Sequence, residues 1–528
     1  MKRILISAAL LTSLGVMAQE TYESAQLATE DLNGTSRYVG MGGAMEALGA
    51  DISTLHSNPA GIGMFRKSWI GVTAGATIQQ GNDNVNRIFN KTGVTNADLN
   101  QIGFVYATTT RKGNSLNFGF DFKKNRNFNE ILTATNRLHN SSASTKSAIG
   151  KVLGRYNYSD YLVNEVVNSQ FGDDGSAAYA VADSYAFSAT NEGYIGEYAF
   201  NFSGSINNRV YLGFSLGIKD VHYNSDSEYM ETLLDASDNY RGDLSITDLR
   251  KITGTGVDVK FGIIFRPVES SPFRIGLYIN TPTWYRLTCT SDQAAAFYVS
   301  PDNDVDSQTG NIIVDDSYGN VAKWDYNVNT PWKFGLSLGH TISNMFAIGA
   351  TYQYSDYSTI DNRVASVETY DYYDGWGWGY TESYRSSRSD NLMNNNTKAS
   401  LKGVSLLKIG FESKPVPEVA IRLGYNYQSA IYDKSRGTKE TTLDTDGSYL
   451  ATNSFTNWGD THRVTFGLGF KLDTNLNLDL SYQYSTTKGD FYPFENMNET
   501  SGTVANTPVV TEVKNNRHQL SATLGYRF

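Results

Sequence analysis

The sequence has a single cysteine, Cys289, which excludes an intramolecular disulfide. Prolines are few, ten in 528 residues, and none interrupts a segment with strand-like alternation. Beyond the N-terminal stretch no segment has 18 consecutive apolar residues, so we expect no transmembrane helix. There is no block of basic residues and the net charge is −10, which argues against nucleic acid as a partner.

Residues that bind metals or cofactors are also sparse. An acidic stretch, Asp302–Asp306, begins like a calcium loop, but Ser307 stands at position six and Ile313 at position twelve. This excludes an EF-hand and leaves loose calcium binding in an acidic loop open. The six histidines are scattered, and none is paired at the spacing of metal ligands: His56, His139, His222, His340, His462 and His518. We therefore expect no cofactor and no structural metal.

Two matches to Gly-x-Ser-x-Gly occur, at Gly213–Gly217 and Gly335–Gly339. A serine hydrolase needs this motif on a sharp turn between a strand and a helix. Both matches instead lie in the middle of alternating segments, where glycine and serine form the small, polar half. No pair of carboxylates stands out as an acid–base pair, so we expect no enzymatic activity.

Aromatic residues are abundant, with 35 tyrosines and 25 phenylalanines, although the mean hydropathy is negative. A transmembrane β-barrel has this composition, because alternation places its apolar half toward lipid and aromatic girdles flank the membrane. Ser115–Phe122 shows the alternation most clearly, with Leu116, Phe118, Phe120 and Phe122 on one face and small or polar residues on the other.

Fourteen segments alternate in this way, which is an even number, as bacterial single-chain barrels require. The sequence therefore predicts an all-β fold, a 14-stranded antiparallel transmembrane barrel with an N-terminal hatch in its lumen. The predicted strands are Trp69–Gln79, Gln101–Thr109, Ser115–Phe122, Glu197–Ile206, Arg209–Ile218, Gly256–Phe265, Phe273–Ile279, Trp332–His340, Asn344–Tyr354, Val404–Phe411, Glu418–Tyr427, Arg463–Phe470, Leu476–Tyr484 and His518–Phe528.

The connections between these strands alternate strictly between short and long. The shortest is Asn207–Asn208 and the longest is Lys123–Gly196. Outer-membrane barrels have short periplasmic turns and long outer loops. Both ends of the barrel then lie on the periplasmic side, and the hatch is expected to enter the barrel from below.

The N-terminal stretch is expected to be a signal peptide, residues 1–18. Lys2 and Arg3 precede the apolar run Ile4–Leu14, and Val16–Ala18 resembles a cleavage site. We divide the remainder into a hatch or plug, residues 19–68, and the barrel with its long outer loops, residues 69–528. Together with the aromatic C-terminal residue, Phe528, these features predict the bacterial outer membrane as the location.

The hatch is rich in glycine and alanine over Ser36–Gly63 and has few large apolar residues. Its glycines permit sharp turns and close packing. We expect Glu20–Asn33 to be an extended lead-in and Ala44–Leu48 to form a short helical turn. Pro59 prevents a helix from continuing and favours an extended Asn58.

These residues carry a family resemblance. Gly40–Ala44, Gly-Met-Gly-Gly-Ala, followed by Asn58–Gly61, Asn-Pro-Ala-Gly, resembles the hatch of the FadL/TodX outer-membrane transport family. Arg274–Tyr278 with Thr281-Pro282, and Asn329–Lys333, resemble the family's strand connections. The outer loops depart from the family, Lys123–Gly196 most of all.

The resemblance implies passive uptake of hydrophobic small molecules, long-chain fatty acids or aromatic hydrocarbons. We expect a monomer in contact with outer-membrane lipid and lipopolysaccharide. By the same resemblance, the ligand would pass through an apolar pocket above a movable hatch and leave through a gap in the barrel wall. By analogy, Gly119 is the candidate for that gap. The hatch residues expected to matter are Gly42, Gly43, Asn58, Pro59 and Ala60, with the amide of Asn58 holding the hatch to the wall.

Two outer segments have open interpretations. Ile149, Val152, Leu153, Leu162 and Val166 have helical spacing and predict a helix pair, whose apolar face either forms a ligand groove or packs against neighbouring loops. Tyr370–Tyr380 is an aromatic, glycine-rich loop tip for carbohydrate stacking or for ordering the rim. Two alternative functions also stay open, a general diffusion porin for polar solutes and a surface receptor or adhesin on a closed barrel.

Overall fold

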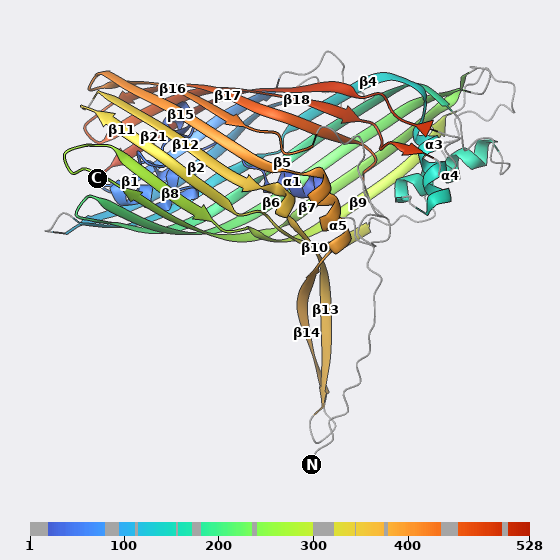
Figure 1. Cartoon of the computed structure of the whole chain (residues 1–528), viewed down its shortest axis with the longest axis horizontal. Coiled ribbons are helices and arrows are strands. Elements are labelled where there is room, and N and C mark those ends of the chain that lie inside the picture. Colours follow the sequence, from blue (N-terminus) through green and yellow to red (C-terminus); the bar gives the residue numbers. More distant parts are fainter. Residues whose placement is uncertain are drawn as a thin grey trace.

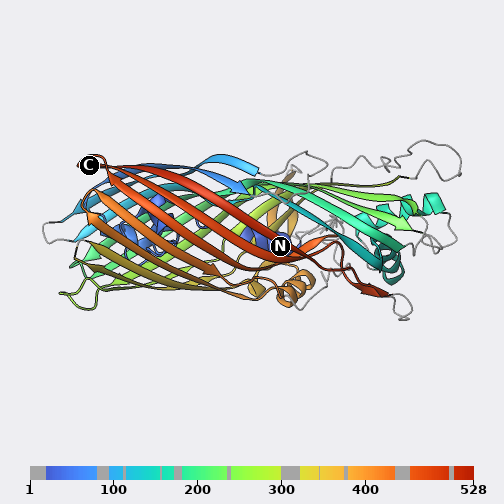
Figure 2. The same cartoon turned by 90° about the horizontal axis from the view of Figure 1, so that it is seen from above.

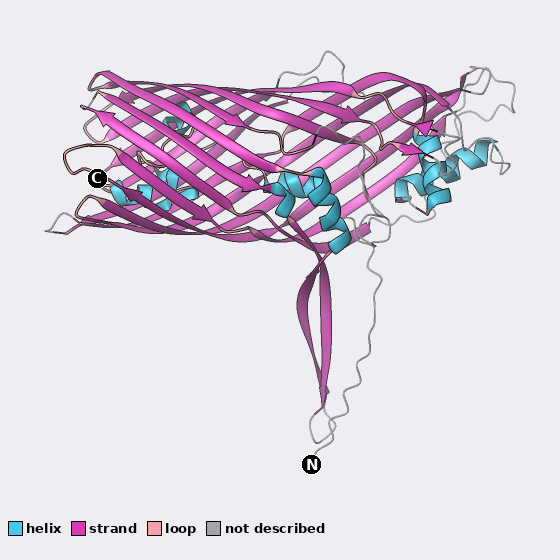
Figure 3. Cartoon of the chain, viewed as in Figure 1, coloured by secondary structure: helices cyan, strands magenta, loops and turns pink. Residues whose placement is uncertain are grey.

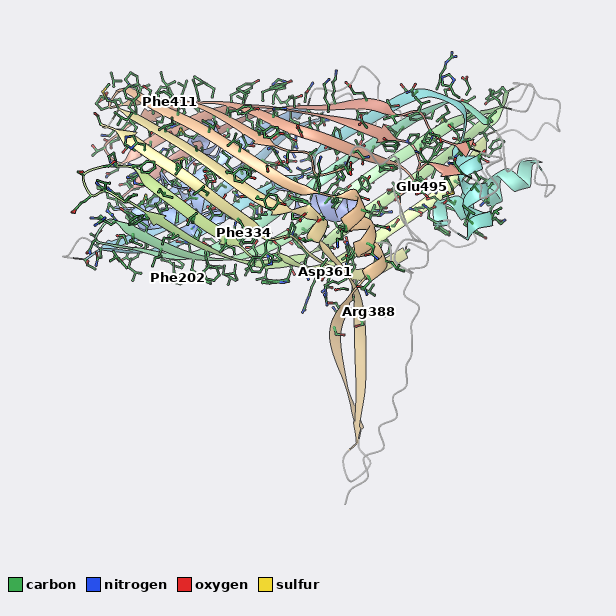
Figure 4. All side chains as sticks on the ribbon, viewed as in Figure 1. Phe202, Phe334, Asp361, Arg388, Phe411 and Glu495 are labelled. Atoms are coloured by element: carbon green, nitrogen blue, oxygen red, sulfur yellow. The ribbon has the colours of Figure 1, made fainter. Side chains whose placement is uncertain are left out.

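Alternating side chains explain the barrel that the computed structural model shows. In β3, Leu116 is 65% exposed on the outside, whereas Asn117 and Asp121 are buried inside. Phe202, Phe334 and Phe411 also point away from the barrel (Figure 4). The structure describes residues 20–79, 94–110, 114–154, 157–171, 181–234, 240–298, 322–343, 345–373, 379–433, 452–498 and 505–528.

All fourteen predicted strands are present and close into one antiparallel barrel, which confirms the predicted fold class (Figure 1). The ring closes where β1 pairs with β21, and Trp69 lies opposite Arg527. Its strands are β1 (Trp69–Gln79), β2 (Val94–Thr109), β3 (Ser115–Asn127), β5 (Val181–Ile206), β6 (Val210–Leu234), β7 (Tyr240–Phe265), β8 (Arg274–Asn280), β11 (Lys333–Ile342), β12 (Phe346–Asp356), β15 (Gly403–Val416), β16 (Val419–Gln428), β17 (Phe455–Lys471), β18 (Leu476–Tyr492) and β21 (Thr511–Arg527).

The sheet continues beyond the membrane on one side of the barrel, where the sequence suggested only loops. The three strands β5, β6 and β7 are 25 or 26 residues long. Further strands pair with them or with one another above the barrel: β4 (Glu130–Ser141), β9 (Trp284–Tyr298), β10 (Ala322–Asn329), β13 (Asp361–Tyr373) and β14 (Gly379–Ser389). A short pair, β19 (Met497–Asn498) and β20 (Ala505–Asn506), lies apart from this sheet.

The sheet can continue beyond the membrane because the apolar and polar faces of the long strands change sides along their length. In β6, outward residues are apolar up to Ile218, and the next two outward residues are Asp220 and His222. The inward residues change the opposite way, from Lys219 to the buried Val221 and Tyr223. The outer half of the sheet therefore has a polar outside and an apolar inside, as in a water-soluble protein.

Four helices lie in the outer half of the molecule. The helices α3 (Ala143–Leu153) and α4 (Tyr158–Phe171) pack on each other, and α4 packs on β7 and β9. The helix α5 (Asn391–Ser400) packs beside α1 (Thr21–Ala28) and the short η5 (Tyr357–Thr359). The β13–β14 hairpin projects sideways from the barrel (Figure 1, Figure 3). It includes the backbone of Tyr370–Tyr373, but the loop tip at 374–378 and the side chains around it lie outside the described residues. In the part of the chain that the structure describes, no helix is long and apolar enough to cross a membrane.

The N-terminal segment, Glu20–Ser68, lies inside the barrel (Figure 1, Figure 2). It contains α1 (Thr21–Ala28), α2 (Ser36–Gly40), η1 (Ile52–His56) and η2 (Pro59–Met64). The expected extended lead-in was wrong, because Thr21–Ala28 form the helix α1. Its residues Tyr22, Ala25, Leu27 and Ala28 are buried in an apolar cluster with residues of β6, β7 and β9. At Ala44–Leu48 the chain forms a single turn, in which the Gly49 N–H donates to the Met45 carbonyl. A short helix forms earlier, where the Thr35 side chain accepts a hydrogen bond from the Tyr38 N–H.

The expected direction of entry was wrong as well. Glu20, the first described residue, contacts Arg250 in the outer half of β7. From there the segment descends through the lumen toward the end with the short turns, where the Phe528 N–H donates to the Ser68 carbonyl. The N-terminal signal peptide, residues 1–18, and the calcium-like stretch at 302–313 lie outside the described residues.

Candidate transport pathway through the barrel

A buried ionic network joins the N-terminal segment to the barrel wall. His56 Nε2 lies 2.6 Å from Asp121 Oδ2, and its Nδ1 lies 3.0 Å from Glu197 Oε1. Lys260 Nζ is 2.6 Å from Glu197 Oε1 and also contacts Asp258. All five side chains are almost fully buried. Each charge therefore depends on its partners, because burying an unpaired charge is costly.

A second network holds the middle of the segment. Arg37 Nε lies 3.2 Å from Glu412 Oε2, which also accepts a 2.7 Å hydrogen bond from Arg422 Nε. Glu46 is buried beside Lys408, whose Nζ lies 2.6 Å from Glu46 Oε1. Charged residues of the inward wall thus fix the segment at several heights.

Gly42 and Gly43 lie where the segment turns against the wall. Both have positive φ, +62° and +78°, a region that favours glycine. A Cβ on Gly42 would lie 2.9 Å from the Tyr425 nitrogen and 3.1 Å from the Ile409 carbonyl oxygen. The close approach that the sequence predicted for these glycines is thus seen, whereas their role in uptake stays a prediction.

Asn58, Pro59 and Ala60 face a patch of wall made of glycines. A Cβ on Gly213 would lie 2.3 Å from both the Ala60 nitrogen and the Pro59 carbonyl carbon. A Cβ on Gly262 would lie 2.0 Å from Asn58 Oδ1. Because these wall positions have no side chains, the backbone of the segment lies directly against β6 and β7.

The amide of Asn58 does not make the expected bond to the wall. Its Oδ1 accepts from the Ala60 N–H and caps η2, while its buried Nδ2 has no hydrogen-bond partner among the described residues. The wall holds this stretch through other side chains: Asn201 Nδ2 donates to the Pro59 carbonyl and Asn117 Nδ2 to the Ile62 carbonyl.

The gap expected at Gly119 is absent. Gly119 pairs with Val105 of β2 on one side and with Asn201 of β5 on the other, in unbroken ladders. The register between β3 and β5 shifts further along, between Lys124 and Arg126. A Cβ on Gly119 would meet its neighbours only at ordinary van der Waals distances. The pairing therefore gives Gly119 no part in an opening.

Three cavities follow the N-terminal segment through the barrel. The outer cavity, about 120 Å³, lies against α1 and shares Gln26, Glu130 and Trp458, among other residues, with the middle cavity. The middle cavity, about 130 Å³, shares Asp31 and Arg463 with the inner cavity of about 70 Å³. The three form a series from the outer end to His56.

The lining of this series changes along its length. Aromatic residues, including Tyr22 and Trp458, line the outer cavity. The middle cavity contains Lys124, Arg126, Arg463 and Arg517 against Asp31 and Glu130. The expected apolar pocket above the N-terminal segment is therefore replaced, in the described structure, by a lumen lined largely by charged and polar groups.

Comparison with solved structures defines the fold. The chain resembles a Pseudomonas aeruginosa FadL homologue with a TM-score of 0.51, at 11% identity, over 95% of this chain and 100% of that chain. This is a FadL-type fold. The monoaromatic hydrocarbon channel CymD, at 11% identity, covers 95% of this chain and 98% of its own with a TM-score of 0.47. The Ralstonia pickettii toluene transporter TbuX, at 14% identity, covers 94% and 99% with a TM-score of 0.44.

No family model matches the sequence, and no curated protein matches it. The FadL-type fold, with apolar side chains facing outward around the barrel, fits a bacterial outer membrane.

In this FadL-type barrel the predicted outer helix pair is present as α3 and α4. Leu162 and Val166 are buried in an outer apolar cluster with residues of β5, β6 and β7. Ile149 is fully buried, Leu153 is half-buried and Val152 is 67% exposed. The structure thus places Leu162 and Val166 in packing contacts. A ligand groove at these five residues stays a prediction.

A buried glutamate attaches α3 to the sheet. Glu231 lies near the outer end of β6, beyond the apolar exterior, and accepts hydrogen bonds from the Ala143 and Ser144 amides. Tyr229 Oη donates to it at 2.6 Å. Burial raises the pKa of Glu231 from its ordinary 4.5 to about 7, although these hydrogen bonds act in the opposite direction.

This raised pKa predicts a pH dependence of the outer helices. The folded state binds the Glu231 proton more tightly than the unfolded state, so stability falls as pH rises from about 4.5 to 7, by up to about 3 kcal/mol. The variant Glu231→Gln should lose this dependence. Hydrogen exchange of the α3 amides at pH 5 and pH 8, corrected for intrinsic rates, measures it. Equal pH dependence in both proteins would contradict the prediction.

Proposed function

We propose that this protein is an outer-membrane channel for passive uptake of hydrophobic small molecules, gated by the N-terminal segment. The observation that carries the proposal is the series of three cavities that follows this segment from the outer end to His56. A closed barrel with a chain segment inside its lumen can conduct a solute only if that segment moves. The cavities mark where a solute would replace it.

The outer cavity supplies the first contacts. Its aromatic lining would receive an apolar solute that the polar lipopolysaccharide layer dissolves poorly. Transfer of such a solute from water is favoured by about 0.8 kcal/mol for each buried methylene. The solute then passes the cationic middle cavity, where the guanidinium groups of Arg126 and Arg463 would bind a carboxylate head group.

Long-chain fatty acids and aromatic hydrocarbons are the two substrate classes under this proposal. CymD and TbuX are described as a monoaromatic hydrocarbon channel and a toluene transporter, respectively. The excess of lysine and arginine in the middle cavity supports the fatty acid, because toluene carries no anionic group.

The experiment is to purify the full-length protein in detergent, extract it and identify the bound small molecules by mass spectrometry. We expect a fatty acid or another apolar compound that is absent from an unrelated barrel purified in the same way. The paired variant Arg126→Gln with Arg463→Gln should retain less fatty acid and the same amount of neutral hydrocarbon. A blank extract after incubation with oleate and with toluene would contradict uptake of either class.

A channel for polar solutes is the second candidate, and the charged lining of the lumen favours it. The two candidates differ in planar bilayers. A diffusion pore conducts ions steadily without any change to the protein, whereas a gated hydrophobic channel stays closed until the N-terminal segment moves.

A further inference from the structure

The outer cavity has an acidic edge around one buried arginine. Arg250 Nη1 lies 3.1 Å from Glu20 Oε1 and 2.6 Å from Glu23 Oε1, and Nη2 lies 3.2 Å from Asp248 Oδ2. Gln293 Nε2 donates to the same Asp248 oxygen at 2.9 Å. Three carboxylates thus meet one guanidinium, which leaves two net negative charges when all of them are ionised.

Two carboxylate oxygens in this cluster have no partner. Glu23 Oε2 and Asp248 Oδ1 are buried and accept no hydrogen bond within the described structure. Both residues are more than nine-tenths buried, and both line the outer cavity. A buried, unpaired carboxylate oxygen is costly, so a bound donor with positive charge would stabilise it.

Aromatic rings form much of the remaining wall. Tyr22 and Tyr432 stack with their ring centroids 4.9 Å apart, and Tyr223 and Trp458 also line the cavity. Ring faces attract cations, most strongly where water is excluded. No group of three or more metal-ligating side chains is placed to hold a metal ion in the residues that the structure describes.

We propose that the outer cavity binds a small organic cation, a primary ammonium group on a short aliphatic chain. The ammonium hydrogens would donate to Glu23 Oε2 and Asp248 Oδ1, and the chain would lie against the rings. A volume of about 120 Å³ suits a ligand of this size. The site is separate from the cationic middle cavity and does not depend on uptake of hydrophobic solutes.

Protons should compete with this cation. Burial raises the pKa of Glu23 to about 7, with Arg250 acting to lower it. Binding should therefore weaken as pH falls through 7, by roughly tenfold from pH 8 to pH 6. The titratable or charged groups that face Glu23 are Glu20, which directly precedes α1, Tyr223 of β6, Asp248 and Arg250 of β7, Cys289 of β9 and Tyr326 of β10. Glu130 of β4 lines the same cavity.

Titration calorimetry of the full-length protein in a nonionic detergent tests the proposal. The probe is n-butylammonium, and n-butanol is the neutral control of similar size. We expect saturable binding of n-butylammonium at pH 8, weaker binding at pH 6, and binding of n-butanol at least tenfold weaker than that of n-butylammonium at pH 8. Equal heats for the two probes, or binding of Ca²⁺ in place of n-butylammonium, would overturn the proposal.

Variants separate the site from general electrostatic attraction. Glu23→Gln and Asp248→Asn keep the shape of each side chain and should each weaken n-butylammonium binding at least tenfold. Asp220→Asn removes a charge from the solvent-facing side of β6 and should leave binding unchanged. Heat-modified mobility in gels reports whether each variant is folded. If Asp248→Asn does not fold, the Glu23→Gln variant alone tests the site. Full binding in a folded Glu23→Gln variant would contradict the site.

Discussion

The variant Gly213→Ala should displace the N-terminal segment and open the channel. The added methyl group would lie 2.3 Å from the Ala60 nitrogen and 2.5 Å from the Pro59 carbonyl oxygen, so backbone must move rather than a flexible side chain. Overpacking of this kind costs about 1–3 kcal/mol. If the N-terminal segment gates the channel as proposed, we expect steady ion conductance of this variant in planar bilayers, no steady conductance of the wild-type protein, and faster hydrogen exchange over residues 59–64 of the variant.

The matched control is Gly119→Ala. Gly119 also faces the lumen beside the N-terminal segment, but the nearest atom to its added methyl is 3.5 Å away, at Asn201 Cβ. This variant should stay closed and exchange like the wild type. If both alanine variants conduct equally, or neither does, the contact of Gly213 with the segment does not hold the channel closed.

Among the single variants named in this section, Lys260→Met should lower the free energy of unfolding the most. Lys260 is buried between Glu197 and Asp258, and Glu197 also lies 3.0 Å from His56. Removing the ammonium leaves the two buried carboxylates with Lys219 as their remaining lysine partner, at 3.1 Å from Asp258 Oδ2 and 4.0 Å from Glu197 Oε2. Removing one partner of a buried ion pair typically costs about 3–5 kcal/mol. Urea unfolding, followed by the loss of heat-modified mobility, should show the decrease.

Lys251→Met is the control for this variant. Lys251 lies on the same strand, β7, with its side chain exposed to solvent. Its replacement should change the unfolding free energy little, because exposed ion pairs contribute about 0–1 kcal/mol. The double variant Lys260→Met with Glu197→Gln should recover part of the loss. If Lys260→Met unfolds like Lys251→Met, the buried network does not stabilise the barrel.

The barrel was predictable because its rule is local. A strand between lipid and lumen must alternate apolar and polar residues, so the sequence alone assigns Leu116 to the outside and Asn117 to the inside of the barrel. The outer extension was missed because the rule reverses after Ile218. Beyond that residue, inward apolar and outward polar positions resemble an ordinary soluble sheet, and a long connection conceals them.

The candidate site was predictable only in part. Gly42 and Gly43 predicted a close approach of backbone because they lack side chains, and the structure shows that approach. The wall residues against which Asn58–Ala60 pack could not be predicted. Gly213 and Gly262 are separated from Asn58 by 150 residues or more, and only the register of the strands brings them together. The charged lumen was equally hidden, since lysine and glutamate on inward positions read as ordinary polar alternation.

The position of α1 has a practical consequence for labelling the protein. Because Glu20 reaches the outer half of β7 while Phe528 lies beside Ser68, the two ends of the described chain are at opposite ends of the barrel. A bulky protein fused directly before Glu20 would have to be accommodated at the outer end, next to the aromatic cavity. A fluorophore or affinity handle attached after Phe528 would remain on the short-turn side and leave the lumen undisturbed.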